Sequence, residues 1–455
     1  MAFENRDPRA ATPAPARRLR VAVVGSGISG LSAAWLLSSA HEVVVYEKDR
    51  RLGGHANTVD VPTRDGTIGV DAGFIVFNKP NYPNLTALFA HLGVGIEDTD
   101  MSFGASIDNG RIEYSGQGLS SVFANRMSAF SPAHWAMVLD ILRFNREAKL
   151  ALADGIAEDL TLGAFVDQQG YSKAFVRRFL APMAAAIWST PSLRILDYPA
   201  AALFRFYDNH GLFQVSKNPR WNTVTGGSRT YVERLSQPVI ANARLGVGAA
   251  RIERIAGGVL VTDDKGHADR FDHVVVATHA DRALGMIAAP TPREAALLKA
   301  FCYQQNRAVV HFDERHMPRR RRAWASWNYL GGAAGPSVTY WMNRLQNLRS
   351  DREVFVTLNP GSPVRDEAIV AEFDYDHPMF TLETAKAQAE IWSLQGAGGV
   401  WYCGAHFGSG FHEDGLQAGL AVAEDLGGVR RPWTVANESG RIWRRDAPPV
   451  ALAAE

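Results

Sequence analysis

The sequence predicts an α/β fold, in which a doubly wound, parallel-sheet domain is interleaved with a second domain of sheet and helices. Residues 20–49 give the first indication, because a β-branched run, a glycine turn, an Ala/Leu-rich helix and a second apolar run follow one another. Strand-and-turn sequence recurs at 222–288 and 396–430, with helical and aromatic-rich stretches between the blocks. We therefore expect one doubly wound domain to be assembled from three separate segments.

The domain boundaries follow from these blocks. Residues 1–19 are rich in Pro, Ala and Arg and lack the apolar core of a signal peptide, so they predict a disordered leader. The doubly wound, Rossmann-like domain is expected to comprise 20–75, 222–288 and 396–430, the α+β domain 76–221 and 289–395, and a C-terminal tail 431–455.

Composition places the chain among ordinary globular proteins. Of its 455 residues, 46% are hydrophobic and 21% are charged, and the formal net charge of +1 argues against nucleic-acid binding. Cys302 and Cys403 are the only cysteines, which predicts a reducing, cytoplasmic compartment and no disulfide framework. No run of about 18 apolar residues appears, so no helix is expected to span a bilayer. Peripheral contact with the inner face of a membrane and the oligomeric state stay open.

A glycine-rich turn opens the first predicted helix. Gly25, Gly27 and Gly30 form G-x-G-x-x-G directly after a strand, which permits a tight turn and brings backbone amides close to a pyrophosphate. Glu47 ends the next strand, at the spacing of about 20 residues where a carboxylate binds ribose hydroxyls. The predicted dinucleotide contacts in this unit are Gly25, Ser26, Gly27, Ile28, Ser29, Gly30, Glu47 and Lys48.

A second glycine pair follows in "RRLGGHAN". Gly53 and Gly54, with Arg51 and His55 beside them, add backbone amides and positive charge for the same pyrophosphate. The order of these motifs resembles that of the FAD-dependent superfamily of amine oxidases, protoporphyrinogen oxidases and phytoene-type desaturases. The resemblance implies a doubly wound FAD-binding domain and non-covalent FAD as the cofactor.

Later segments extend this resemblance over most of residues 20–427. The segment "VDAGFIVF" is similar to the family segment near the isoalloxazine and ribityl chain, and "VGAARIERIAGGVLV" is similar to the strand that meets the adenine. The cofactor contacts implied in these segments and at the end of "VVVATH" are Asp71, Ala72, Gly73, Ala249, Ala277 and Thr278.

The segment "CGAHFGSGFHEDGLQAG" resembles the closing loop of the family, whose following helix directs its N-terminus at the flavin. The cofactor contacts implied here are Gly404, Ala405, Gly415 and Leu416. Relatives carry an acid where this chain has Ala405 and His406. A metal site is the alternative for the loop, with ligands His406, His412, Glu413 and Asp414. We expect no metal, because the helical i, i+4 spacing that would aim two histidines together is missing.

Two residues of this loop are candidates for catalysis. His412 is predicted to carry a proton, with Glu413 as its partner or as a flavin ligand. Loop-stabilising hydrogen bonds are an equally good explanation of both residues. Cys403 ends an apolar strand, as a buried thiol does, and this position favours FAD without a covalent bond.

Aromatic strands supply the candidate substrate site. The residues proposed to line an apolar tunnel are Trp327, Asn328, Tyr329, Tyr340, Trp341 and Asn343. Sheet packing is the alternative for each of them. Lys217 is interpreted as a surface residue, although amine oxidases place a lysine near the flavin. The basic run Arg319 to Arg322 is either a solvated loop or a contact for anionic lipid headgroups.

The stretches "WASWNY", "LNP" and "GFHEDG" resemble a bacterial branch of predicted FAD-dependent proteins linked to fatty acyl modification. The preferred function is therefore dehydrogenation, or desaturation, of an apolar substrate such as a lipid acyl chain, by hydride transfer to flavin N5. The alternatives are a flavin amine oxidase, an FAD-dependent double-bond isomerase and a non-enzymatic flavoprotein. The expected partner is an apolar small molecule or lipid.

Overall fold

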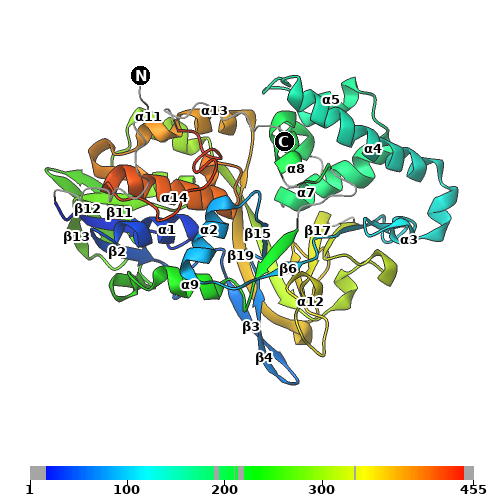
Figure 1. Ribbon diagram of the computed structural model, residues 1–455, viewed down its shortest axis with the longest axis horizontal. Helices are drawn as coiled ribbons and strands as arrows, with labels where there is room; N and C mark the ends of the chain where they lie inside the picture. The colour runs from blue at the N-terminus through cyan, green and yellow to red at the C-terminus, as the bar shows by residue number, and fades with distance from the viewer. Residues whose placement is uncertain (1–16, 189–193, 210, 214–219, 333–334, 445–455) are drawn as a thin grey trace, which may run out of the picture.

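The computed structural model describes residues 17–188, 194–209, 211–213, 220–332 and 335–444. Within these ranges the chain forms a parallel-sheet domain, a large mixed sheet and a helical lobe (Figure 1). Most of the expected leader and Lys217 lie outside the described residues. None of the helices in the described ranges is both long and apolar enough to cross a bilayer.

The parallel sheet has the strand order β10-β2-β1-β14-β20, and every neighbouring pair in it is parallel. Its strands are β1 (Arg20–Val24), β2 (Glu42–Glu47), β10 (Ala243–Leu245), β14 (His273–Val276) and β20 (Val400–Tyr402). The valine-rich central strands are buried, as strands covered on both faces must be. All five strands come from the three predicted blocks, which confirms the predicted α/β, doubly wound class.

Helices α1 (Ile28–Leu37) and α14 (His412–Gly427) pack side by side against the parallel sheet (Figure 1). Gly419 permits this approach, because a Cβ atom there would lie 2.2 Å from the Ser29 carbonyl oxygen. The other elements of this domain are α2 (Pro83–Leu92), α9 (Arg229–Ser236), α10 (Ala280–Met286), α11 (Pro292–Lys299), α13 (Leu382–Ile391) and the antiparallel strands β11 (Ala249–Ile255), β12 (Gly258–Asp263) and β13 (Ala268–Phe271).

The second domain is built around a seven-stranded mixed sheet with the order β19-β15-β18-β17-β16-β7-β8. Its strands are β7 (Phe103–Ile107), β8 (Ile112–Ser115), β15 (Cys302–His311), β16 (Trp327–Gly332), β17 (Gly335–Trp341), β18 (Phe355–Leu358) and β19 (Ile369–Met379). Smaller elements connect it to the parallel sheet: β3 (Thr58–Thr63), β4 (Gly66–Asp71), β5 (Val76–Asn78), β6 (Ile96–Thr99), β9 (Trp221–Val224) and α12 (Met342–Leu345).

A helical lobe covers one end of this sheet (Figure 1). Its helices are α3 (Leu119–Val122), α4 (Pro132–Ala153), α5 (Leu162–Gln168), α6 (Lys173–Phe175), α7 (Ala181–Trp188) and α8 (Ala200–Asn209), with a 3₁₀ turn η1 (Arg126–Phe130) before α4. Ser131 caps α4 by accepting from the His134 amide, and Pro132 stands at the first helical position. Phe144 of α4 is fully buried and packs among six aromatic rings at the centre of the lobe.

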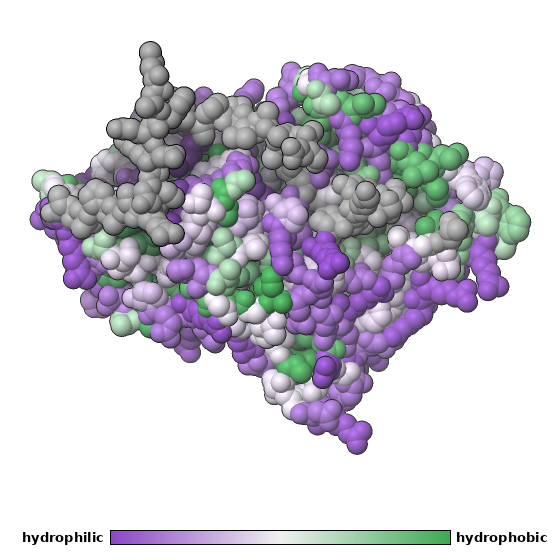
Figure 2. Space-filling view, viewed as in Figure 1, coloured by the Kyte–Doolittle hydropathy of each residue, from purple (hydrophilic) through white to green (hydrophobic). Residues whose placement is uncertain are grey.

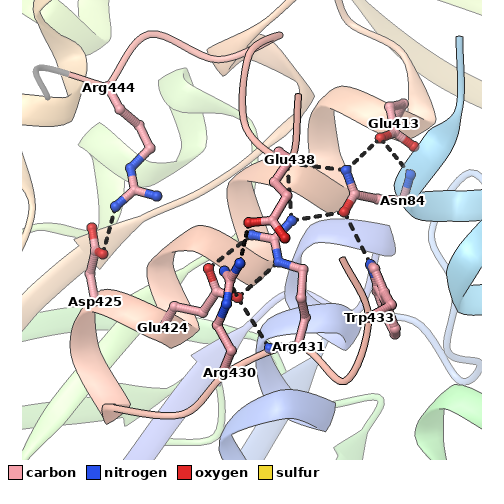
Figure 3. A network of polar contacts seen from close by, with 9 residues as sticks. All are labelled: Asn84, Glu413, Glu424, Asp425, Arg430, Arg431, Trp433, Glu438 and Arg444. Carbon is pink, nitrogen blue, oxygen red and sulfur yellow. Dashed lines mark hydrogen bonds and ion pairs between the residues drawn. The ribbon is translucent and has the colours of Figure 1, made fainter. Parts of the chain in front are cut away.

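The C-terminal segment beyond α14 folds back onto the parallel-sheet domain instead of forming a loose tail (Figure 3). Arg431 is only 2% exposed and donates to Glu424 at 2.8 Å and to Asn84 at 2.8 Å. Arg441 donates to the Asp414 carboxylate at 2.6 Å. Residues as far as Arg444 therefore belong to the fold, and they bind the first turns of α14 and α2.

Candidate functional site

The first glycine turn has a backbone that only glycine permits. Gly25 has φ = +97°, and a Cβ atom there would lie 2.8 Å from the Ala277 carbonyl oxygen. No side chain caps the start of α1, and a Cβ atom at Gly27 would meet no atom within 4 Å. The first amides of α1 therefore face open space, where a phosphate can accept their hydrogen bonds.

Glu47 lies at the carboxyl end of β2 beside this turn, as predicted. One carboxylate oxygen accepts from the Ser26 amide at 2.9 Å and from the Ser26 hydroxyl at 2.5 Å. The other oxygen accepts from the Asp49 amide at 2.9 Å. These bonds fix the carboxylate and leave acceptor capacity on the oxygen that binds Asp49, where a ribose hydroxyl can donate.

The second glycine loop lies directly against the first. A Cβ atom at Gly54 would be 3.1 Å from the Gly27 Cα, and Gly53 has φ = +111°. Arg51 was expected to offer its guanidinium to the pyrophosphate. It instead donates to the carbonyl oxygens of Gly54 at 2.8 Å and Ala56 at 3.2 Å, so its charge shapes the loop. Lys48 is exposed at the end of β2.

The start of the last helix, after the closing loop, lies against the first glycine segment. A Cβ atom at Gly415 would lie 2.7 Å from the Ser29 hydroxyl, 2.9 Å from the Ile28 side chain and 3.6 Å from the Ala405 amide nitrogen. The N-termini of α1 and α14 therefore converge, with Leu416 buried behind them. The structure brings together the predicted contacts Gly25, Ser26, Gly27, Ile28, Ser29, Gly30, Gly54, Ala277, Thr278, Ala405 and Gly415.

Two further cofactor segments occupy the expected places, with one difference in role. Gly73 lies against His55, whose carbonyl oxygen would be 2.1 Å from a Cβ atom at Gly73. Asp71, however, directs its carboxylate to protein partners: it accepts from Thr58, from the amide and hydroxyl of Ser228, and from Gln346. Burial raises the pKa of Asp71 to about 6, and these bonds oppose the rise. The side chain ties segments together and is not free to bind a cofactor.

Strand β11 begins at Ala249, next to the Glu47 end of β2, because the Val247 amide donates to the Glu47 carbonyl oxygen at 3.0 Å. Ala72 is buried, and its amide donates to the Asn57 carbonyl oxygen at 2.8 Å. Both positions are compatible with backbone contacts to a dinucleotide that extends from the first glycine turn.

The structure does not pair His412 with Glu413. The Glu413 carboxylate is fully buried and accepts from the amides of Asn84 and Leu85 at 3.1 and 2.9 Å, which are orphan donors in the first turn of α2. His412 Nε2 instead contacts the Tyr231 hydroxyl at 2.6 Å, and its ring stacks on Phe74 at 3.8 Å. Burial lowers the pKa of His412 to about 3. Glu413 therefore caps the N-terminus of α2. His412 instead contacts the aromatic side chains of Tyr231 and Phe74.

A group of imidazoles lies where the parallel-sheet domain meets β19. His55 stacks on Tyr375 at 4.8 Å between ring centroids, and it lies 5.7 Å from His377 and 6.2 Å from His279. Burial, and then the neighbouring imidazoles, lower the pKa of His55 well below its usual value. We name His55, His279, His377 and His412 the histidine cluster. Sequence reasoning missed His279 and His377.

Two side-chain amides, from Asn359 and Asn306, fix the tautomer of His377. The Asn359 amide donates to Asn306 Oδ1 at 2.7 Å, which orients the Asn306 side chain. Asn306 Nδ2 then donates to His377 Nδ1 at 2.9 Å, so the ring proton resides on Nε2. Burial lowers the pKa of His377 to about 4, which keeps the imidazole neutral near pH 7. His377 therefore presents a fixed N–H donor.

The six predicted substrate residues divide between different surfaces. Strand register puts Trp327 opposite Tyr340 and Tyr329 opposite Val338, on the sheet face that also carries Tyr375. Three of the predicted residues are elsewhere and serve the fold: Asn328 donates to Ala325 and Thr339, Trp341 to Glu353, and Asn343 to Arg352. Asn328 and Trp341 alternate with Trp327 and Tyr340, so they lie on the opposite face of the sheet, and Asn343 lies in α12.

Two side chains of the closing strand and loop, Cys403 and His406, indicate how a flavin would be bound. Cys403 is fully buried, and burial raises the pKa of its thiol far above the usual value, so the nucleophilic thiolate that a covalent flavin bond needs is disfavoured. His406 Nε2 is buried and has no hydrogen-bond partner among the described residues. An acceptor from a bound cofactor would satisfy it. In the described ranges, no group of three or more His, Cys, Asp and Glu side chains is arranged so that it could hold a metal ion.

These observations fit FAD. Open space faces the amides of α1 beside Gly27, a fixed carboxylate stands at Glu47, and an unsatisfied imidazole nitrogen lies in the closing loop at His406. The residues placed to hold the cofactor are the glycine turn, Glu47, the loop at Gly53 and Gly54, and the start of α14. FAD supplies hydride acceptance when bound.

Replacing Glu47 by alanine is expected to weaken FAD retention about 10- to 100-fold, because hydrogen bonds to a charged group contribute about 1.5–3 kcal/mol. The measurement is the 450 nm absorbance that survives dialysis. Glu42→Ala is the matched control, since Glu42 lies on the same strand but is exposed and pairs with Arg20 at 3.0 Å. Equal yellow colour in both variants after dialysis would exclude Glu47 as the ribose ligand.

The flavin containing amine oxidoreductase family matches residues 28–341 of this chain. The putative flavin-containing monoamine oxidase AofH of Mycobacterium tuberculosis is 24% identical over 335 residues, which cover 70% of each chain. A redesigned putrescine oxidase has a similar fold (15% identity, TM-score 0.65, 90% of this chain and 99% of that one). So has the CLA-producing fatty acid isomerase from P. acnes (15% identity, TM-score 0.63, 90% and 98%). The chain therefore belongs to the flavin-containing amine oxidoreductase family and is an FAD-dependent oxidoreductase.

Proposed function

We propose that the protein desaturates an apolar substrate, with a lipid acyl chain as the preferred class. One observation carries this proposal: an apolar face of the seven-stranded sheet leads to the histidine cluster. Cross-strand pairs place Phe373 and Tyr375 of β19 on this face together with Tyr340 and Trp327. We name this surface the aromatic face.

The aromatic face has the length and chemistry that an acyl chain requires. It crosses five strands, from β19 to β16, and at about 4.8 Å between strands it extends roughly 20 Å. Ala308 of β15 and Leu358 of β18 fill the positions between the rings, and both are buried. Apolar side chains of this kind bind methylene groups by exclusion of water and dispersion.

The polar end of the face supports proton handling. Desaturation breaks two neighbouring C–H bonds: one hydrogen leaves as hydride to the flavin, the other as a proton, and a C=C bond forms. His55 is neutral and stacked on Tyr375, so it is the candidate acceptor for the proton. His377 keeps its proton on Nε2, where it can donate to a carboxyl or ester oxygen of the acyl substrate and so position the chain. With FAD bound, oxygen or a quinone-like molecule would serve as the final electron acceptor.

Double-bond isomerisation is the second candidate. It uses the same apolar face, and the fatty acid isomerase among the similar folds acts on a substrate of this class. Isomerisation returns the hydride to the substrate, so the product mass does not change. Amine oxidation is the third candidate, because the curated relative is described as a monoamine oxidase.

The test is anaerobic incubation of the FAD-loaded protein with phospholipid, unsaturated fatty acid, or primary amines and polyamines. Bleaching at 450 nm by lipid, with a product two hydrogens lighter, is the expected result. A product of unchanged mass would indicate isomerisation, and rapid bleaching by amines alone would overturn the proposal. Tyr340→Leu should weaken the lipid response more than Trp341→Leu, because these neighbours lie on opposite faces of β17.

A further inference from the structure

The outward face of α4 and of η1 before it carries a cluster of exposed apolar side chains. Ten large apolar side chains are exposed in the described residues, and six of them lie in this short stretch. They are Met127, Phe130, Trp135, Leu139, Leu142 and Leu150. Phe130 is 81% exposed and Met127 70%. Figure 2 shows apolar residues gathered at this end of the molecule, where Figure 1 draws α4.

Helix α4 is apolar on two opposite sides. Met137 and Phe144 face the core, whereas Trp135, Leu139 and Leu142 recur at helical spacing on the outer side. An apolar stripe on a helix is ordinarily covered. The outer stripe of α4 is exposed in the described chain, which indicates a surface for a partner outside it.

Exposed arginines border this cluster. Arg126 precedes Met127, and Arg111 lies beside it because Asn125 donates to the Arg111 carbonyl oxygen at 2.9 Å. Arg146 continues the outer side of α4, with 72% of its side chain exposed, and its guanidinium lies 3.8 Å from the Glu147 carboxylate. The nearby acids, Asp140 and Glu147, are both turned towards Arg143 at 3.7 and 3.6 Å, with side chains 13% and 25% exposed.

The basic loop highlighted in the sequence contributes only in part. Arg320 donates to the buried Glu113 at 2.8 Å, and Arg321 pairs with Glu353 and lies over Trp324, so both are committed to the fold. Arg319 is exposed, and its side chain passes Gly110, next to Arg111. Arg319 therefore extends the positive rim of the apolar cluster.

We propose that this surface docks on an anionic phospholipid bilayer. The apolar side chains enter the interface between headgroups and acyl chains, while Arg111, Arg126 and Arg146 meet lipid phosphates. We name it the docking face. Its positive rim selects a negatively charged bilayer over a second, similarly charged copy of this chain.

The docking face lies over the end of the aromatic face. The inner side of α4, through Met137 and Ile141, packs in the same cluster as Tyr329 and Val338. A docked bilayer would thus approach the far end of the path to the histidine cluster. Docking itself does not depend on the proposed substrate, and it is measured without turnover.

Sedimentation of the FAD-loaded protein with vesicles tests the docking face. Binding to vesicles that contain phosphatidylglycerol, weak binding to pure phosphatidylcholine and a decrease with salt are expected. The double variant Leu139→Gln/Leu142→Gln should bind at least about tenfold more weakly, since each buried leucine contributes about 1.5–3 kcal/mol. Arg126→Gln and Arg146→Gln should each reduce binding about fivefold, at about 1 kcal/mol per cation.

The matched control is Ile240→Gln/Ile255→Gln, which removes exposed apolar side chains of the parallel-sheet domain and should bind as the wild type does. An unchanged flavin spectrum shows that each variant is folded. The proposal is overturned if the wild type ignores anionic vesicles or if the leucine variant still binds. It is also overturned if the wild type is a dimer that the leucine substitutions dissociate, because the face would then join two copies.

Discussion

His377→Leu should slow substrate reduction of the bound flavin by about 10²-fold, the usual effect of losing a group that positions the substrate. The Asn306 side-chain amide donates to Nδ1 of this imidazole and so orients the ring. Leucine has a similar volume but lacks the Nε2 donor. Stopped-flow measurement of bleaching under anaerobic conditions gives the rate. Retained FAD and a wild-type melting temperature would show that the loss is chemical.

Asn306→Leu tests the orientation of the His377 ring separately from the presence of its Nε2 donor. The variant keeps the His377 ring but releases its tautomer, so it should show a smaller loss of rate and a changed pH profile. In the wild type, burial holds the pKa of His377 near 4. Protonation of Nδ1 near this pH breaks the hydrogen bond from Asn306 that orients the ring, so the rate should be level above about pH 5 and should fall as the pH approaches 4. Without the Asn306 amide at Nδ1, this limb should shift. A full rate in His377→Leu would remove the histidine from the mechanism.

The cofactor half of the site was predictable because its motifs are local. The turn Gly25 to Gly30 needs a positive φ and close approach within a few residues, and Glu47 follows one helix later on the adjacent parallel strand. These constraints act between neighbours in sequence. This short sequence pattern therefore predicted the first two parallel strands and the glycine turn between them.

The histidine cluster was not predictable in this way. His55 follows the second glycine loop, His279 follows β14 and His377 lies on β19, so three segments distant in the chain supply one surface. Asn306 reaches His377 only because β15 pairs with β19 in a particular register. Register depends on the whole sheet, and a single sequence does not determine it. The alternation of Tyr375 and His377 was the one local signal.

Glu413 illustrates a different failure. Its place beside His412 suggested an acid–base pair, since both residues titrate and both lie in the closing loop. Successive residues at the start of a helix point about 100° apart, however, so adjacency in sequence separates their side chains. The Glu413 carboxylate accepts hydrogen bonds from the free amides at the start of α2, and the His412 imidazole contacts the Tyr231 hydroxyl.

The C-terminal segment after α14 contains a buried arginine, Arg431, that pairs with Glu424. Arg431→Ala should lower the free energy of unfolding by about 3–5 kcal/mol, the usual cost of removing one partner of a buried ion pair. The Arg431 side chain is fully buried, and it contacts Glu424 and Asn84 together (Figure 3). Asn84 in turn donates to Glu413 beside the closing loop. The variant should therefore also release FAD more readily than the wild type.

Urea unfolding of the FAD-loaded protein measures this loss, and Arg444→Ala is its matched control. Arg444 lies in the same segment and pairs with Asp425 at 2.8 Å, but the two side chains are 29% and 32% exposed. A pair with this exposure contributes about 0–1 kcal/mol, so the control should unfold almost as the wild type does. Equal, small losses in both variants would show that the segment merely covers the domain. A loss confined to Arg431 would show that it holds α14 and α2, and through them the closing loop, in place.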